Sequence, residues 1–338
     1  MIKLFRKDFM TKPIVLSGMQ PTGDGKLHLG NLEGALKNWV ALQDKYQMYL
    51  CIVDWHALTS DYDKTKGLKN RILQVALDYL ASGLDPEKCA IFVQSLVKEH
   101  AELHLLLSMI TPLGWLERVP SYKEKKEELG LDSYGFLGYP LLQAADILIY
   151  RAQFVPVGKD QLPHIELTRE VARRFDSVYG DVFPEPEALL SEYPTILGTD
   201  GRKMSKSYQN DIAIGDSEED TAKKVSKMYT DPQKIHKGDK GHPDQCPVYM
   251  LHKIYTQEFD VKTIHADCIS GKFGCVECKK LLISNMNKSL TPIRKKRAEL
   301  ERNLDYVKEV LTSGSDKARS KAKETMAEVR KAIGMIDG

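Results

Sequence analysis

The chain has 338 residues, of which 42% are hydrophobic and 28% are charged, and its formal net charge is +2. This is the composition of an ordinary globular protein of about two domains, and the near balance of charge does not by itself indicate a polyanionic partner. No stretch is apolar enough for a membrane span, and residues 1–13 are too charged for a signal peptide. We therefore expect no membrane association and a cytoplasmic protein, with Met1 or Met10 as its start.

Short apolar runs alternate with helical patterns in the first two thirds of the chain. The runs lie at 13–18, 48–55, 90–95 and 152–158. This alternation predicts βαβ units and a parallel sheet, and therefore an α/β fold. Between the first two runs, apolar residues from Leu32 to Leu42 follow helical spacing, and Asn31 is the expected N-cap of that helix.

A glycine-rich turn, PTGDGKLHLGN at 21–31, joins the first run to that helix. Glycines let backbone amides approach a phosphate closely, and the start of a helix attracts anions. The glycine spacing matches neither the dinucleotide motif nor the P-loop motif. Taken alone, the turn is either a phosphate site or a tight structural connection.

A second glycine-flanked segment, GRKMSKS at 201–207, carries Lys203 and Lys206 three positions apart. Two lysines on a mobile loop can neutralise a departing pyrophosphate. The alternative is a solvated basic loop.

A polar helix face is predicted within YPLLQAADIL at 139–148. Tyr139, Gln143 and Asp146 lie at positions i, i+4 and i+7, so they share one face of a helix among leucines. Such a face is either a binding site or a buried polar cluster with partners of its own.

Four cysteines lie late in the chain, with the spacing C-x21-C-x6-C-x2-C: Cys246, Cys268, Cys275 and Cys278. Four thiolates suit either zinc or an iron–sulfur cluster, and the spacing does not choose between them. Unpaired structural cysteines are the alternative. The surrounding region is helical and basic, and RKKR at 294–297 either faces nucleic acid or is a solvated helix face.

Several segments resemble a known family. HLGN at 28–31 and KMSKS at 203–207 resemble the two signatures of class I aminoacyl-tRNA synthetases. CIVDWHALT, YPLLQAADILIY and VPVGKDQLPHIELTR are similar to segments of tryptophanyl-tRNA synthetases. The resemblance extends from about residue 14 to 232, with a looser helical similarity to the end.

The resemblance implies a Rossmann-type catalytic domain over 1–209, completed by a C-terminal helix at 305–338 that packs back on it. It also implies a helical anticodon-binding domain over 210–304, with the cysteine insert at 246–278. The implied reaction has two steps. The carboxylate of L-tryptophan attacks the α-phosphate of ATP and releases pyrophosphate, and tryptophan is then transferred from the adenylate to the 3′ end of tRNA(Trp).

The resemblance also implies roles for individual residues on the nucleotide side. The implied catalytic residues are His28, Asn31, Lys203 and Lys206, together with Mg²⁺ held mainly by the phosphates. The implied ATP site comprises Gln20, Pro21, Thr22, Gly30, Asn31, Gly158, Lys159, Asp160, Ile196, Lys203, Met204, Ser205, Lys206 and Ser207. Two extra residues within Asp24–Lys26 depart from the family's turn and have no role in its pattern.

On the amino-acid side, Asp146 is expected to accept the indole N–H, while Tyr139 and Gln161 hold the ammonium group. The other implied members of this site are His56, Gln143, Val155 and Val157. The Tyr-x3-Gln-x2-Asp arrangement also occurs in tyrosyl-tRNA synthetases, so tyrosine is an alternative substrate. A related nucleotidyltransferase or a non-catalytic RNA-binding paralogue are further alternatives, although a paralogue would be expected to have lost a signature residue.

Finally, the resemblance implies a homodimer. It also favours a [4Fe–4S] cluster over Zn²⁺ at the four cysteines, because some bacterial members of the family carry a cluster with nearly this spacing.

Overall fold

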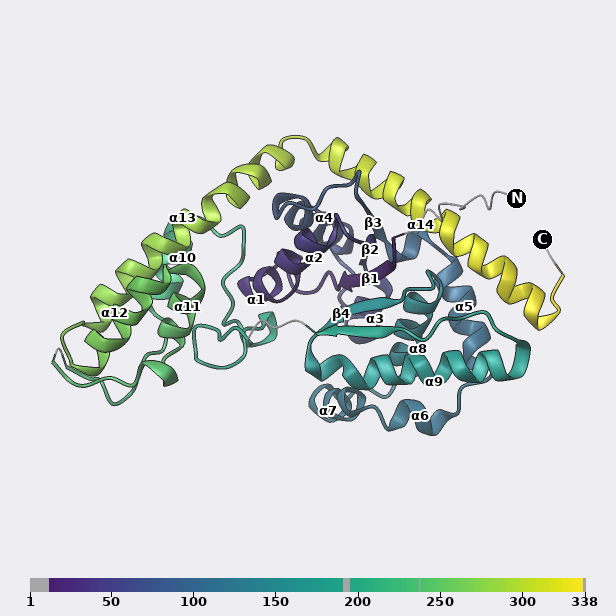
Figure 1. The fold of residues 1–338 in the computed structure, drawn as a ribbon, viewed down its shortest axis with the longest axis horizontal. Helices are drawn as coiled ribbons and strands as arrows, with labels where there is room; N and C mark the ends of the chain where they lie inside the picture. The colour runs from purple at the N-terminus through teal and green to yellow at the C-terminus, as the bar shows by residue number, and fades with distance from the viewer. Residues whose placement is uncertain (1–11, 191–194, 237, 337–338) are drawn as a thin grey trace, which may run out of the picture.

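The computed structural model describes residues 12–190, 195–236 and 238–336. The two possible starts, Met1 and Met10, lie outside the described residues. Within these residues a five-stranded parallel sheet has the order β3-β2-β1-β4-β5 (Figure 1). Its strands are β1 (Ile14–Met19), β2 (Gln47–Ile52), β3 (Cys89–Val93), β4 (Phe154–Val157) and β5 (Glu187–Leu190). The α/β prediction is therefore confirmed.

The strand order reverses at β1, where the ligand crevice of such sheets usually lies. Val15 pairs with Met48 of β2 on one side and with Phe154 of β4 on the other. Four of the strands match the predicted runs. The fifth, β5, was missed because its sequence, EALL, carries no β-branched or aromatic residue.

Alternate strand residues face two separate hydrophobic clusters, as the two-residue period of a strand requires. Met48, Leu50 and Ile52 join the cluster that contains α2 (Lys37–Leu42) and α4 (Leu68–Ala81). Tyr49 and Cys51 join the cluster that contains α5 (Glu99–Ser108), α8 (Tyr134–Leu148) and α9 (Leu162–Tyr179). Both faces of the sheet are thus covered. Shorter helices complete this part of the chain: α1 (Leu29–Asn31), α3 (Asp54–Ser60), α6 (Leu113–Glu117) and α7 (Pro120–Leu129).

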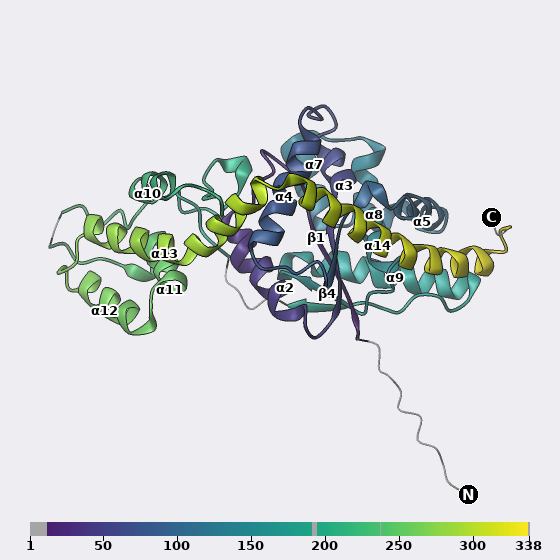
Figure 2. The same ribbon diagram turned by 90° about the horizontal axis from the view of Figure 1, so that it is seen from above.

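The last helix, α14 (Leu304–Ile333), runs along the edge strand β3 (Figures 1 and 2). At Gly314 its backbone comes so close that a Cβ there would collide with the carbonyl oxygen of Ile91. The Oγ of Ser315 accepts a hydrogen bond from the amide of Val93 at 3.4 Å. The helix therefore covers a strand edge that would otherwise be open to pairing.

The remaining helices gather at one end of the molecule (Figure 1). They are α10 (Glu218–Ser226), α11 (Pro247–Tyr255), α12 (Glu258–Ile269) and α13 (Cys275–Glu301). Leu282, Met286 and Leu290 of α13 belong to the same cluster as Leu50 of the sheet, so the helical region shares a core with the sheet region. In the part of the chain that the structure describes, no helix has the length and apolar character needed to cross a membrane.

The RKKR run on α13 is only half solvent-facing, so neither a face toward nucleic acid nor a solvated helix face describes all four residues. Arg297 is buried and pairs with the buried carboxylate of Asp78 on α4. Arg294 donates to the Thr221 hydroxyl at 2.7 Å. Only Lys295 and Lys296 are exposed. Arg297 therefore fastens the helical region to the sheet region, whereas Arg294 links α13 to α10 within the helical region.

Candidate functional site

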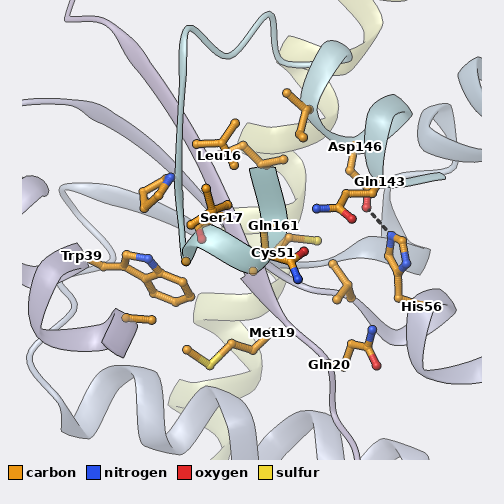
Figure 3. A pocket seen from close by; sticks show the side chains of 18 of the residues that line it. Leu16, Ser17, Met19, Gln20, Trp39, Cys51, His56, Gln143, Asp146 and Gln161 are labelled. Atoms are coloured by element: carbon orange, nitrogen blue, oxygen red, sulfur yellow. Dashed lines mark hydrogen bonds and ion pairs between the residues drawn. The ribbon is translucent and has the colours of Figure 1, made fainter. Parts of the chain in front are cut away.

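A cavity of about 310 Å³ opens at the carboxyl ends of β1 and β4, where the strand order reverses. Figure 3 shows its polar end, where Asp146, Gln143 and His56 lie together, and Trp39 on the opposite wall. Its lining comes from β1 and the residues after it (Leu16–Gln20), from β4 and the residue after it (Val155–Gly158), and from side chains that include Gly34, Ala35, Cys51, Val53 and Gln161. Its size and position are those of a small-molecule site.

Asp146 on α8 is the centre of a buried polar network. His56 Nε2 lies 2.9 Å from Asp146 Oδ2, and His100 Nδ1 lies 2.6 Å from Asp146 Oδ1. The side-chain amide of Gln94 lies 2.9 and 2.8 Å from the two carboxylate oxygens. His100 is held in turn by the hydroxyl of Tyr150 at 2.7 Å. Three side chains therefore orient one carboxylate.

The charge state of Asp146 follows from this network. Burial by itself raises the pKa of the carboxyl, but the charge and hydrogen bond of His100, and then those of His56, outweigh it and hold the pKa below its usual range. The three partners direct four contacts at the two carboxylate oxygens, and Asp146 also lines the cavity. The network therefore presents an ionised acceptor whose direction is already set.

Gln94 and His100 were missed in the sequence. They belong to the short helix Gln94–Leu96 after β3 and to α5, and both are fully buried. Their spacing relative to Asp146 carries no signal, because only the sheet topology brings the end of β3 beside α8.

The other predicted tryptophan-side residues divide into two groups. Gln143, Val155, Val157 and Gln161 line the cavity together with His56 and Asp146. Tyr139 is not among the lining residues, although it lies on the same helix. Its hydroxyl lies 2.7 Å from Ser121 Oγ, which in turn lies 2.7 Å from His164 Nε2.

The glycine-rich turn leads into a helix that starts at Leu29, with His28 as the N-cap. This corrects the assignment of Asn31 as the N-cap, because Asn31 lies inside the first turn and its Oδ1 accepts the amide of His28 at 3.0 Å. The helix then makes a π-helical segment over Leu32–Leu36, which places Gly34 and Ala35 on the cavity wall. Such segments are frequent at functional sites.

His28 sits between the turn and the segment that follows the lysine loop. Its neighbour Leu29 donates its amide to the Ile212 carbonyl at 3.0 Å. Burial lowers the pKa of His28 to about 4; Asp211 opposes this shift, and Lys206 and Lys203 add to it. A Cβ on Gly30 would lie 2.9 Å from the His28 ring, so Gly30 leaves room for the imidazole.

The KMSKS segment folds back on itself around Asn210. Asn210 is buried; its Oδ1 accepts the amide of Ser205 at 2.8 Å, and its Nδ2 donates to Asp200 Oδ1 at 2.7 Å and to the Lys203 carbonyl at 3.1 Å. The sequence reading missed this residue. Lys203 and Ser207 are exposed, whereas Met204 is buried and its amide donates to the Ile196 carbonyl at 2.9 Å.

The remaining predicted nucleotide-side residues surround the same edge of the sheet. Gln20 and Gly158 line the cavity, whereas Lys159 and Asp160 are exposed and lie outside its lining. The Pro21 carbonyl accepts Arg71 Nε at 3.0 Å, and the Thr22 carbonyl accepts Lys206 Nζ at 3.1 Å. The glycine-rich turn and the KMSKS segment are therefore in direct contact.

A second, smaller pocket is lined by all four late cysteines. Its walls include Val248, Tyr249, Ile264 and Phe273, and its polar lining includes Asp231 and Lys234. Burial first, and then the other three thiols, raise the pKa of Cys278 to about 12, and the charge of Lys279 opposes the shift. Among the described residues, no group of three or more Cys, His, Asp or Glu side chains is arranged to hold a metal ion.

Comparisons with known proteins agree with this geometry. A family described as class I tRNA synthetases (W and Y) matches residues 9–291. The tryptophan–tRNA ligase of Thermotoga maritima is 50% identical, over 95% of this chain and 99% of its own. That of Aquifex aeolicus is 45% identical, over 95% and 99%.

Solved structures show the same likeness. The tryptophanyl-tRNA synthetase of Campylobacter jejuni, crystallised with ADP and tryptophan, superposes with a TM-score of 0.86 at 40% identity, over 95% of this chain and 100% of that one. A tyrosyl-tRNA synthetase from Archaeoglobus fulgidus shares the fold, at 21% identity and a TM-score of 0.62. The identities of 40–50% are to ligases for tryptophan, which decides between the two substrates. The chain belongs to the tryptophan–tRNA ligases, class I aminoacyl-tRNA synthetases that join tryptophan to its tRNA.

Proposed function

We propose that the cavity between β1 and β4 binds L-tryptophan, with the indole N–H donated to Asp146. The observation that carries this proposal is the buried, ionised carboxylate that three side chains orient and that lines the cavity. Val155 and Val157 offer apolar walls for an indole ring, and Gln143 and Gln161 add polar groups. The Campylobacter jejuni relative, which was crystallised with tryptophan, supports the assignment.

Tyr139 has a different part in this proposal from the one its motif suggested. Because its hydroxyl is engaged with Ser121 of α7 and it does not line the cavity, we assign it to holding α8 against α7, and through Ser121 and His164 against α9. Gln161 remains the candidate for the ammonium group, together with Gln143.

The ATP side of the proposal consists of the glycine-rich turn and the KMSKS segment. Lys203 and Lys206 would neutralise the phosphate charge, and Asn31 and His28 would orient the phosphates as hydrogen-bond donors. His28 would do so as a neutral imidazole, because burial lowers its pKa to about 4. The other proposed members of the ATP site are Gln20, Pro21, Thr22, Gly30, Gly158, Lys159, Asp160, Ile196, Met204, Ser205 and Ser207. The carboxylate of Asp24 on this turn is paired with Lys206, and the amides, the imidazole and the ammonium groups suit phosphate oxygens better than Mg²⁺, which prefers oxygen ligands. Mg²⁺ would thus be held mainly by the phosphates, where it balances their charge.

Pyrophosphate exchange tests this activity directly. With ATP, Mg²⁺ and each amino acid in turn, the purified enzyme is expected to exchange labelled pyrophosphate into ATP with tryptophan alone. Exchange with tyrosine, or none with any amino acid, would overturn the proposal. Charging of tRNA(Trp) by the same preparation tests the second step.

The four cysteines form part of the same proposal, as ligands of a [4Fe–4S] cluster, with Zn²⁺ as the alternative. The residue types support this, because Cys246, Cys268, Cys275 and Cys278 line one pocket with apolar walls, although the described residues do not arrange their thiols as a metal site. When bound, a cluster would cross-link α11, α12 and α13 through its thiolates. Anaerobic purification is expected to yield a brown protein with about four iron atoms per chain. A colourless protein with zinc would support the alternative, and Cys275→Ser should lose the metal in either case.

The helical region over 210–304 is proposed to meet the tRNA anticodon, and residues 1–209 with 305–338 to form the catalytic domain. Lys272, Lys279 and Lys280 lie beside the cysteines in sequence and are candidates for RNA contacts. We also propose that the enzyme works in the cytoplasm as a homodimer, which sedimentation equilibrium would test.

A further inference from the structure

Asp24 lies in the extension of the glycine-rich turn that has no role in the family's pattern. Its carboxylate Oδ1 is 3.3 Å from the Nζ of Lys206, and the Asp24 side chain is 61% exposed while that of Lys206 is 19% exposed. Lys206 Nζ also donates to the Thr22 carbonyl at 3.1 Å. The second lysine of KMSKS is therefore held on the turn by one full charge and one carbonyl.

The turn is shaped to receive this lysine. Gly23 has φ +61, in the left-handed region, and a Cβ there would lie only 2.8 Å from Lys206 Cδ. The amide of Lys26 donates to Asp24 Oδ1 at 3.0 Å, so a local turn already orients the carboxylate. The extension therefore supplies a preset acceptor beside Gly23, whose missing side chain leaves room for the lysine stem.

We propose that Asp24 is a positioning residue that holds Lys206 on the glycine-rich turn until ATP arrives, so that the phosphates must take Lys206 from it. This inference rests on the proposed function, because it requires Lys206 to bind phosphate. Asp24 and the triphosphate compete for the same ammonium group. Lys206 can bind phosphate only in those enzyme molecules in which it has left Asp24. The Asp24–Lys206 ion pair therefore lowers the apparent affinity for ATP.

The expected size of the effect follows from the exposure of the pair. Partly exposed ion pairs of this kind change an equilibrium by about two- to fivefold. Removing the Asp24 charge should therefore strengthen binding of ATP, and of pyrophosphate, by about that factor. A residue that merely stabilised the turn would have the opposite effect on both ligands.

The test compares Asp24→Asn, which keeps the shape and removes the charge, with Asp24→Glu, which keeps the charge. Equilibrium dialysis with ATP and no amino acid should give a dissociation constant about two- to fivefold lower for Asp24→Asn and close to wild type for Asp24→Glu. Asp305→Asn is the matched control, because Asp305 pairs with Lys308 at 2.8 Å on the surface of α14. It should leave ATP binding unchanged.

A double-mutant cycle identifies the partner. In a Lys206→Gln background, Asp24→Asn should no longer change ATP binding. Unchanged or weaker ATP binding by Asp24→Asn, or an equal gain with Lys206→Gln present, would overturn the inference. Absence of tryptophan-dependent exchange in the wild-type enzyme would instead overturn the proposed function, so the two failures are distinguishable.

Discussion

The two ends of the proposed active site are built differently. At the tryptophan end, Asp146 is buried and held by His56, Gln94 and His100. At the phosphate end, Lys203 is exposed and Lys206 is held by a carbonyl and one exposed carboxylate. A buried network cannot rearrange without leaving a polar group unpaired, whereas an exposed lysine exchanges partners at little cost.

This difference suits the two tasks. Recognition of an indole requires a fixed acceptor at one position, because discrimination depends on a hydrogen bond that a wrong substrate cannot make. Phosphates gain and lose charge as pyrophosphate departs, so cations on a loop that can follow them are more useful. We therefore expect substitutions at the buried end to change specificity and substitutions at the exposed end to change rate.

The largest expected effect is on specificity. Asp146→Ala should reduce the preference for tryptophan over phenylalanine, as a ratio of kcat/KM, by about 10³-fold or more. Pyrophosphate exchange with both amino acids measures it, and the KM for ATP should stay near its wild-type value. Asp146→Asn is the folding control, because it keeps one carbonyl acceptor. An unchanged preference in Asp146→Ala would show that the indole is read elsewhere.

Lys206→Ala should reduce kcat for adenylate formation by about 10²- to 10³-fold, because one preset cation is lost from the developing charge. The KM for tryptophan should change little, since Lys206 is not among the residues that line the cavity. Lys295→Ala removes an exposed lysine of α13 and is the matched control for exchange. A raised KM for tryptophan with normal kcat would contradict the division between the two ends.

His100→Phe should act through Asp146. It removes one donor from the carboxylate and keeps a ring of similar size, so the KM for tryptophan should rise roughly tenfold. Because His100 lowers the pKa of Asp146, the variant should also show an acidic limb in kcat/KM for tryptophan at higher pH than wild type. If His100→Phe bound tryptophan weakly but kept the wild-type pH dependence, His100 would act only by its shape, which would contradict this prediction.

The smallest expected effect concerns the pH response of the phosphate end. The pKa of His28 is lowered to about 4 from its usual 6.5, so the imidazole is neutral throughout pH 6–8. kcat/KM for ATP should then show no acidic limb near pH 6.5 from this residue. The same shift makes His28 destabilising as the pH falls from 6.5 to 4, since the unfolded chain takes up its proton first. An acidic limb near pH 6.5 in kcat/KM for ATP that disappears in His28→Asn would disprove the prediction that His28 stays neutral.

Much of the fold could be predicted from local patterns. The runs at 13–18, 48–55, 90–95 and 152–158 correspond to β1 to β4, because each combines apolar character with flanking turn signals. β5 could not be found in this way, since EALL is as compatible with a helix as with a strand. The RKKR run was expected to be exposed along its whole length. The sequence does not reveal that Arg297 has a buried partner in Asp78.

The proposed site was predictable where its members lie close together in sequence and obscure where they do not. HLGN, KMSKS and the face of α8 are local patterns, so their chemistry can be predicted from the sequence. Gln94, His100 and Asn210 act through partners on other segments, and no spacing rule connects residue 94 with residue 146.

The order of residues was thus sufficient for the family and the parallel sheet, and it singled out the two segments proposed to bind phosphate and the α8 face proposed to bind the indole. Only the three-dimensional packing decided which groups orient Asp146, that Tyr139 bonds Ser121 outside the cavity lining, and that Asp24 meets Lys206. The reason is physical. Helical and strand periodicity act over a few residues, whereas the partner of a buried or charged group is set by which strands and loops the sheet topology brings together.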